Sequence, residues 1–216
     1  MSTGLSESIQ IAVALLERDA ESVRAVLSGE ENRFSRALQA LQQLAEGEGI
    51  PIAIVSGLGA IRYGYPAVTQ DIDVVVGRGD LDRLTMRATM YGLKAAWAPE
   101  SGWHTLSFGD VEINVVPEGG KARNSSPTTI PGPAALDVLQ GLAYASLPGW
   151  MELKLSSGRQ KDRAHVVEVM KACNDAILVQ ARVHLESVHP QYVALFDELR
   201  EEASEEKNQE GERGKR

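Results

Sequence analysis

The sequence predicts a single mixed α/β domain, of the α+β class, with helices at both ends. Short β-branched apolar runs alternate with helical stretches between residues 52 and 116. Apolar side chains at helical spacing dominate the chain before this region and again after residue 134. The length of 216 residues and the 43% hydrophobic content suit one complete core.

Composition narrows the classes of function. Cys173 is the only cysteine, so the chain can form no internal disulfide and a zinc cluster is not expected. The sequence contains no apolar run near the roughly 20 residues of a membrane span, and it begins without a basic-then-apolar signal pattern. We therefore expect a cytoplasmic protein with no membrane partner. The net charge of −8 argues against non-specific coating of nucleic acid.

Changes in pattern divide the chain into four predicted segments. The N-terminal helical segment, 1–49, contains a helix over 6–26 and another over 33–46, which Asn32 can cap. A core segment, 50–133, holds the strands. A C-terminal helical segment, 134–200, packs on that core. From 201 to 216 nearly all residues are charged or polar, which predicts a disordered tail.

Within the core segment the elements follow from local pattern. A strand at 52–55 enters a turn and a short helix, which Gly64-Tyr65-Pro66 ends. Gly109-Asp110 is typical of a hairpin turn, and the Gly- and Pro-rich 117–133 predicts a loop that orders around a ligand. The other predicted strands are 71–76, 93–97, 104–108 and 111–116, and the other predicted helices are 81–90, 149–156, one starting at 161 or 162, and 190–199.

Two aspartates interrupt the apolar strand 71–76. Burying a carboxylate without a partner opposes the burial of its neighbours, so Asp71 and Asp73 need an explanation. Residues two apart on a strand point to the same side. Two carboxylates on one side form a ligand pair for a divalent cation, and we take Asp71 and Asp73 as the metal ligands and catalytic residues.

The turn before this strand suits an anion. Ser56 and Gly57 are small residues between a strand and a helix, where backbone N–H groups stay free for phosphate oxygens. A metal held by the aspartates could face the same phosphates. The alternative is a plain strand pair with solvent-facing aspartates.

These residues resemble a known family. The apolar strand, the small-residue turn and Gly64-Tyr-Pro-Ala-Val-Thr-Gln-Asp-Ile-Asp73 are similar to the DNA polymerase β-type nucleotidyltransferase superfamily. The resemblance spans about 52–170 and is closest to AbiEii-like toxins of type IV toxin–antitoxin systems. It implies a nucleotidyltransferase fold, a small mixed sheet flanked by helices. It also implies Mg²⁺-dependent transfer of a nucleotide from a nucleoside triphosphate to an RNA (such as tRNA), a protein or a small molecule, and an antitoxin partner.

The resemblance assigns further residues to this chemistry. Lys154 would contact the triphosphate, Arg159 and Lys161 would add positive charge, and Asp162 would hold their turn or act in catalysis. Thr69, inside the matching motif, is assigned with Ser56 and Gly57 to nucleotide binding. On residue pattern alone, a lysine in an apolar helix also fits a side chain that reaches solvent.

Three positions depart from the family pattern. The third carboxylate expected on the strand 111–116 aligns with Asn114, which can ligate a metal through its carbonyl oxygen but cannot take a proton. Glu112, on the same side of that strand, is the candidate substitute. The turn reads Ser56-Gly57, and His165 stands where an acidic or amide residue is common. Two other hypotheses therefore stay open: a degenerate protein that binds or regulates, and an antibiotic-modifying nucleotidyltransferase.

Overall fold

The strands form one mixed sheet at the centre of the fold. The computed structural model describes residues 20–98 and 103–213, and within these the sheet has six strands in the order β3-β4-β5-β2-β1-β6. β1 and β2 pair antiparallel, β2 and β5 parallel, and β4 pairs antiparallel with both β5 and β3. The strands are β1 (Ile52–Val55), β2 (Asp71–Val76), β3 (Lys94–Ala98), β4 (Trp103–Phe108), β5 (Val111–Pro117) and β6 (Leu142–Tyr144).

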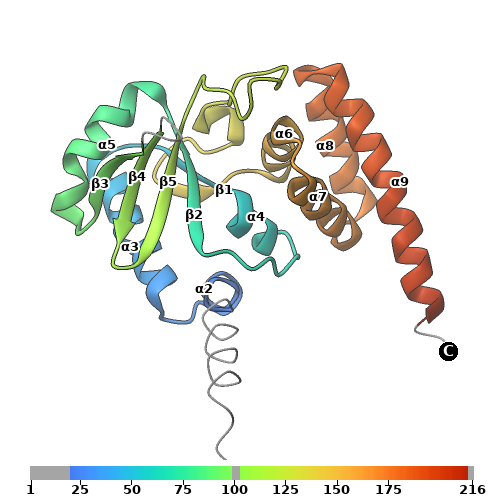
Figure 1. Ribbon diagram of the computed structural model, residues 1–216, viewed down its shortest axis with the longest axis horizontal. Coiled ribbons are helices and arrows are strands. Elements are labelled where there is room, and N and C mark those ends of the chain that lie inside the picture. Colours follow the sequence, from blue (N-terminus) through green and yellow to red (C-terminus); the bar gives the residue numbers. More distant parts are fainter. Residues whose placement is uncertain (1–19, 99–102, 214–216) are drawn as a thin grey trace, which may run out of the picture.

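Helices surround this sheet unevenly. Figure 1 shows α3 and α5 beside the sheet and the group α6–α9 away to one side, with α4 between the sheet and that group. The α-helices are α2 (Glu21–Ser28), α3 (Arg33–Glu48), α4 (Ser56–Arg62), α5 (Leu81–Arg87), α6 (Leu147–Ser157), α7 (Gln160–Ala172), α8 (Asp175–Val188) and α9 (Pro190–Arg213). Short 3₁₀ turns are η1 (Arg78–Asp80), η2 (Ala88–Tyr91) and η3 (Pro133–Leu136). The mixed α/β architecture predicted from the sequence is confirmed.

Burial explains why β1, β2 and β5 form the middle of the sheet. All four residues of β1 are buried, and β2 is buried from Val74 to Val76. Along β5 the apolar Val111, Ile113 and Val115 are fully buried. Runs buried on both faces, as in β1 and the second half of β2, belong at the centre of a sheet covered by helices, whereas β5 is buried mainly on its apolar face. Asp71 and Asp73 therefore lie in the first half of a central strand, before its fully buried part.

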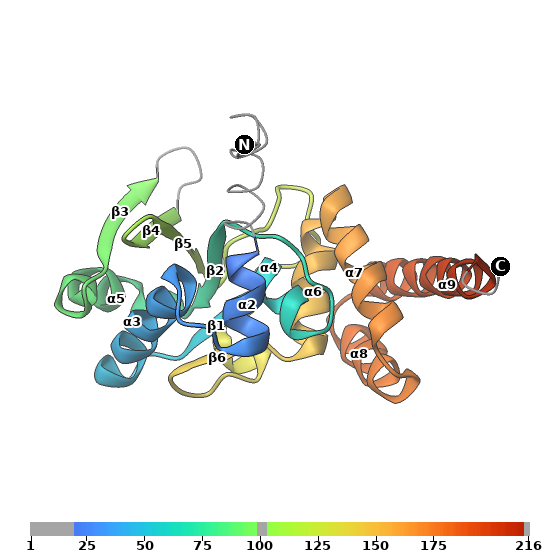
Figure 2. The ribbon, with the colours of Figure 1, turned by 90° about the horizontal axis from the view of Figure 1, so that it is seen from below.

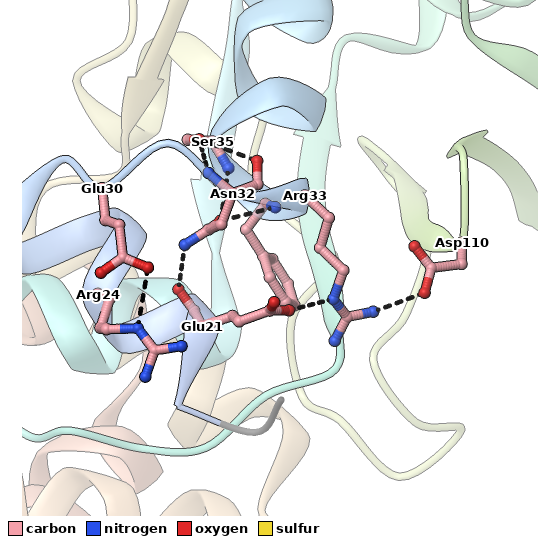
Figure 3. Close-up of polar contacts among 8 residues, drawn as sticks. Glu21, Arg24, Glu30, Asn32, Arg33, Ser35 and Asp110 are labelled. Carbon is pink, nitrogen blue, oxygen red and sulfur yellow. Dashed lines mark hydrogen bonds and ion pairs between the residues drawn. The ribbon is translucent and has the colours of Figure 1, made fainter. Parts of the chain in front are cut away.

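The junction between α2 and α3 is held by polar contacts, which Figure 3 shows. As the sequence predicts, Asn32 caps α3: its side chain accepts from the backbone N–H groups of Phe34 and Ser35. The Ser35 hydroxyl accepts in turn from the Asn32 N–H, which completes a capping box that was not predicted. Arg33 pairs with Glu21 of α2 and, at 3.2 Å, with Asp110 of the β4–β5 turn. One guanidinium thus ties the N-terminal helices to the sheet.

The helices α6–α9 pack on one another, and α6 and α8 begin with side-chain caps. Ser146 accepts from the Gly149 N–H at the start of α6, where Pro148 stands in the first turn. Asn174 accepts from the Ile177 N–H at the start of α8. Figure 2 shows α9 projecting beyond the rest of the group. In the described part of the chain no helix is both long and apolar enough to cross a membrane.

The structure corrects the predicted tail. The sequence predicts a helix that ends at Leu199 and disorder from 201, whereas α9 continues to Arg213. Lys171 of α7, 11% exposed, pairs with Glu206 at 3.2 Å and Glu210 at 2.7 Å, and Lys207 donates to the Lys171 carbonyl oxygen. The acidic residues that predicted disorder therefore form ion pairs between α9 and α7.

Two other expectations also differ. The sequence predicts helix from residue 134, but between 134 and 146 only the end of η3 is helical. Part of this stretch forms β6 instead, an edge strand parallel to β1. The helix α8 was not expected as a separate element. Of the predicted helix over 6–26, residues 6–19 lie outside the described part of the chain, and 21–28 form α2. The segment boundaries at 49, 133 and 200 stay predictions.

Candidate functional site

The parallel pairing of β2 with β5 brings three polar side chains together. Its register places Asp71 opposite Glu112 and Asp73 opposite Asn114. The Asn114 amide donates to Asp71 Oδ2 at 3.1 Å and to Asp73 Oδ1 at 3.0 Å. Thr69 donates to Asp71 Oδ1 at 2.7 Å. Two carboxylates therefore share one amide donor at the start of a central strand.

The carboxylate pair is electrostatically crowded. Burial raises the pKa of Asp73 above its usual range and the neighbouring Asp71 charge raises it further, while hydrogen bonds from Ser56 and Asn114 act in the opposite direction. A cation between two such groups would relieve both the burial penalty and the repulsion. The Asn114 amide donates to both carboxylates but carries no charge, so it offsets their repulsion only in part. The pair is therefore suited to a cation.

Ser56 joins β1 to α4 in an unusual conformation. Its φ of 57° lies in the left-handed region, a conformation that is unfavourable for a residue with a Cβ atom. Residues held in such conformations occur often at functional sites. Trp150 of α6, fully buried, holds it by donating from Nε1 to the Ser56 carbonyl oxygen at 2.9 Å. Next to it, a Cβ on Gly57 would lie 2.8 Å from Thr69 Cβ, so only glycine fits without a shift. The turn is therefore packed directly against the aspartate strand.

Lys154 and Arg159, which the resemblance assigns to triphosphate binding, meet at the junction of α6 and α7. Lys154 Nζ lies 2.7 Å from Asp162 Oδ1, and Arg159 Nε lies 2.6 Å from Asp162 Oδ2. Ser157 donates to the same carboxylate. Asp162 is fully buried and Lys154 is 5% exposed, whereas the Arg159 side chain is 48% exposed. The carboxylate is the centre of this cluster.

This cluster fixes the charge of both partners. Burial opposes the charge of Asp162, but the contacts with Lys154, Ser157 and Arg159 outweigh it and lower its pKa to about 2. A carboxylate with so low a pKa and three donors is a weak base, so its arrangement suits positioning. Burial lowers the pKa of Lys154, while Asp162 favours its ammonium form.

Both groups of residues line one cavity of about 430 Å³, a size within the range of small-molecule sites. Its lining includes Ser56, Gly57, Thr69, Asp71, Asp73 and Asn114 from the first group, and Lys154, Arg159, Lys161 and Asp162 from the second. The structure thus brings together every residue that the sequence assigns to the site except Glu112, which is exposed and does not line the cavity. Among the described residues, no group of three or more His, Cys, Asp or Glu side chains could hold a metal.

Several cavity residues were assigned no role in the site from the sequence, although His165 was noted there as a departure from the family pattern. Ser157 and His165 line the cavity beside the basic cluster, and the apolar part of the lining includes Val75, Trp103, Val116, Ala122, Ile130 and Leu153. The apolar residues give no signal in the sequence because they look like ordinary core positions. Ser157 had a weak signal, since it belongs to the Ser-Ser-Gly turn between two helices.

No protein-family model and no curated protein matches the chain. Some solved structures do. The antibiotic-resistance factor ANT(2'')-Ia is 14% identical with a TM-score of 0.42, and the match covers 84% of this chain and all of that one. The CCA-adding enzyme in complex with ATP is 13% identical with a TM-score of 0.39, over 82% of this chain and 49% of that one.

A third similar structure is a tRNA nucleotidyltransferase complexed with a primer tRNA and an incoming ATP analog, at 13% identity and a TM-score of 0.34, over 74% of this chain and 60% of that one. The chain therefore spans about half the length of the CCA-adding enzyme. Identities of 13–14% and TM-scores below 0.5 leave the chemistry of this chain to be argued from its own residues.

Proposed function

We propose that this protein is a Mg²⁺-dependent nucleotidyltransferase that moves a nucleotide from a nucleoside triphosphate to an acceptor hydroxyl. One observation carries the proposal: the Asp71–Asp73 pair and a wall of three basic side chains, Lys154, Arg159 and Lys161, face the same cavity. A phosphate chain needs both features, because a divalent cation bridges phosphate oxygens and basic groups neutralise the remaining charge.

The donor set fits Mg²⁺. This ion is usually held by one or two carboxylates together with substrate phosphates, so a third carboxylate is not required. The observation that favours a cation at this position is that Asp71 and Asp73 lie side by side, both within hydrogen-bond distance of the one Asn114 amide nitrogen. Asp71 and Asp73 would hold the ion, with the Asn114 carbonyl oxygen available after a turn of the amide. Bound Mg²⁺ would polarise the phosphate oxygens.

The chain's own groups would orient the triphosphate. The Ser56–Gly57 turn offers backbone N–H groups next to the aspartates, and Thr69 packs against Gly57. Arg159 is half-exposed and anchored through Nε to Asp162, so its terminal nitrogens remain for phosphate oxygens. Lys161 stands exposed on the same wall.

The transfer step is a substitution at the α-phosphorus. The acceptor oxygen forms the new P–O bond, the bond to the bridging oxygen of the β-phosphate breaks, and pyrophosphate leaves. Asn114 cannot take the proton of the acceptor hydroxyl, and Asp162 is held by three donors. We assign that proton to the Asp71–Asp73 pair, whose carboxylates are the remaining oxygen bases at the site.

The acceptor is the open part of the proposal. We propose an RNA such as a tRNA, or a protein, and a role as the toxin of a toxin–antitoxin pair with an antitoxin partner, because the motif around Asp71 and Asp73 resembles AbiEii-like toxins. The alternatives are a degenerate binding protein, which Asn114 in place of a carboxylate favours, and an antibiotic-modifying enzyme.

The test is incubation of the full chain with Mg²⁺, each of the four labelled triphosphates and total RNA or cell protein. We expect pyrophosphate release and a labelled acceptor, lost in Asp73→Ala and retained in Asp175→Asn, which removes an exposed carboxylate on α8. Triphosphate binding without transfer would favour the degenerate protein. Label on an antibiotic added to the incubation, but on no macromolecule, would favour the antibiotic-modifying enzyme. No triphosphate binding in the presence of Mg²⁺ would overturn the proposal.

A further inference from the structure

His165 is a cavity residue that the proposed transfer step does not use. It lies in the second turn of α7, half-buried, and it lines the cavity beside Lys154 and Asp162. Its ring packs against Tyr65, with the ring centroids 5.6 Å apart. An imidazole fixed on one side by an aromatic ring has limited freedom to turn, so the identity of its hydrogen-bond partners decides what it can offer a ligand.

The lysine beside it determines which ring nitrogen carries the proton. Lys154 Nζ lies 3.3 Å from His165 Nδ1. An ammonium group has only donors, so Nδ1 must be the acceptor and the hydrogen of a neutral imidazole must be on Nε2. Asp162, 2.7 Å from the same Nζ, keeps the lysine in its ammonium form. The buried pair therefore fixes the Nε2–H tautomer.

The same surroundings keep the imidazole neutral. Burial and then the Lys154 charge lower the pKa of His165 to about 4, with Lys161 and Arg159 acting in the same direction and Asp162 against them. Protonation would also place a second donor against the Lys154 ammonium. At neutral pH the residue thus offers one hydrogen-bond donor and no charge.

We propose that Nε2–H of His165 donates to a phosphate oxygen of the triphosphate bound in the cavity, which makes His165 a binding residue of this chain. The inference rests on the proposed function and deepens it. Lys154, Arg159 and Lys161 surround this part of the wall, so its potential favours the anionic part of a nucleotide over the sugar or the base. The basic side chains already attract the phosphate through their charge, and a neutral hydrogen-bond donor would fix the orientation of one phosphate oxygen.

The experiment uses protein with ¹⁵N-labelled histidine and correlates ring nitrogens with ring protons, His165 being assigned by its loss in His165→Gln. We expect a protonated Nε2 and an unprotonated Nδ1 at pH 7 without ligand. Inorganic tripolyphosphate with Mg²⁺ should shift Nε2, and adenosine should not. His165→Phe should bind tripolyphosphate about 5- to 10-fold more weakly, the effect of one hydrogen bond, while His165→Gln, which keeps an N–H donor, should bind nearly as the wild type does.

The outcomes separate the two proposals. A proton on Nδ1, or tripolyphosphate binding that leaves Nε2 unshifted and is equal in His165→Phe, overturns the role of His165 and leaves nucleotidyl transfer intact. A shift caused by adenosine alone overturns the assignment to phosphate. If tripolyphosphate shifts Nε2 but no acceptor is ever labelled, the His165 contact stands and the transferase proposal falls. No binding of tripolyphosphate or ATP to the wild type overturns both.

Discussion

Lys154 Nζ and Asp162 Oδ1 lie 2.7 Å apart, with side chains 5% and 0% exposed. Removing one member of a buried ion pair leaves the other charge unpaired, which costs about 3–5 kcal/mol. We expect Asp162→Asn to lower the free energy of unfolding by about that amount in urea titrations. The control is Glu198→Gln, which breaks the exposed pair with Arg163 and should cost less than about 1 kcal/mol. Equal effects of the two substitutions would contradict the buried pair.

The free energy of unfolding should fall in two stages on acidification. His165 has a folded pKa of about 4 against 6.5 in the unfolded chain, so the unfolded state binds an extra proton between these values and stability decreases as pH falls from 6.5 to 4. Asp162, at about 2 against 3.8, adds a further loss of about 2 kcal/mol as pH falls from 3.8 to 2. Urea midpoints measured at a series of pH values test this. His165→Gln should lack the first stage, and an unchanged profile in that variant would contradict it.

The left-handed backbone of Ser56 predicts that glycine is more stabilising than alanine at this position, the reverse of their order inside a helix. Both Ser56→Gly and Ser56→Ala lose the hydroxyl contact with Asp73, but only alanine keeps a Cβ at φ 57°. We expect the glycine variant to be the more stable by about 1 kcal/mol in thermal unfolding. Ser204, exposed in the middle of α9, is the matched position, where glycine should be the less stable by a similar amount. The same order at both positions would show that Ser56 carries no strain.

A third carboxylate should strengthen the response to Mg²⁺. Asn114→Asp replaces the amide that bridges Asp71 and Asp73 with a third negative charge. In EDTA this variant should be less stable than the wild type by about 1–3 kcal/mol, and saturating Mg²⁺ should raise its melting temperature more than that of the wild type. Asn114→Ala, which loses the same bonds without adding charge, should gain no such response. A Mg²⁺ shift equal in all three proteins would contradict a metal at this position.

The C-terminal half of α9 should depend on Lys171. Its ammonium pairs with Glu168, Glu206 and Glu210, and these contacts hold the acidic end of the helix against α7. We expect Lys171→Met to speed amide hydrogen exchange in 203–210 by about tenfold, with little change in β2. Glu205→Gln removes an exposed charge from the same helix and serves as the control. Exchange as slow in Lys171→Met as in the control would mean that packing alone keeps this segment helical.

Local pattern was enough to predict most of the elements and to select the main residues of the candidate site. Alternation and β-branched runs located β1, β2 and β5 to within a residue, because burial on a pleated strand imposes that pattern. Asp71 and Asp73 stood out because a carboxylate in such a run is costly. Where local pattern was weak, as in the three-residue β6, the prediction was wrong.

Tertiary structure alone decided what each polar group faces. The parallel register of β2 and β5 places Asn114 between the two aspartates, and strand register depends on pairing that spans 41 residues of chain. The same holds for the pairing of buried Asp162 with Lys154, for the contact of Lys154 with His165, and for the acidic residues of α9 that pair with Lys171. Charge, protonation and hydrogen bonding depend on neighbours distant in the sequence, and those neighbours exist only in the folded chain.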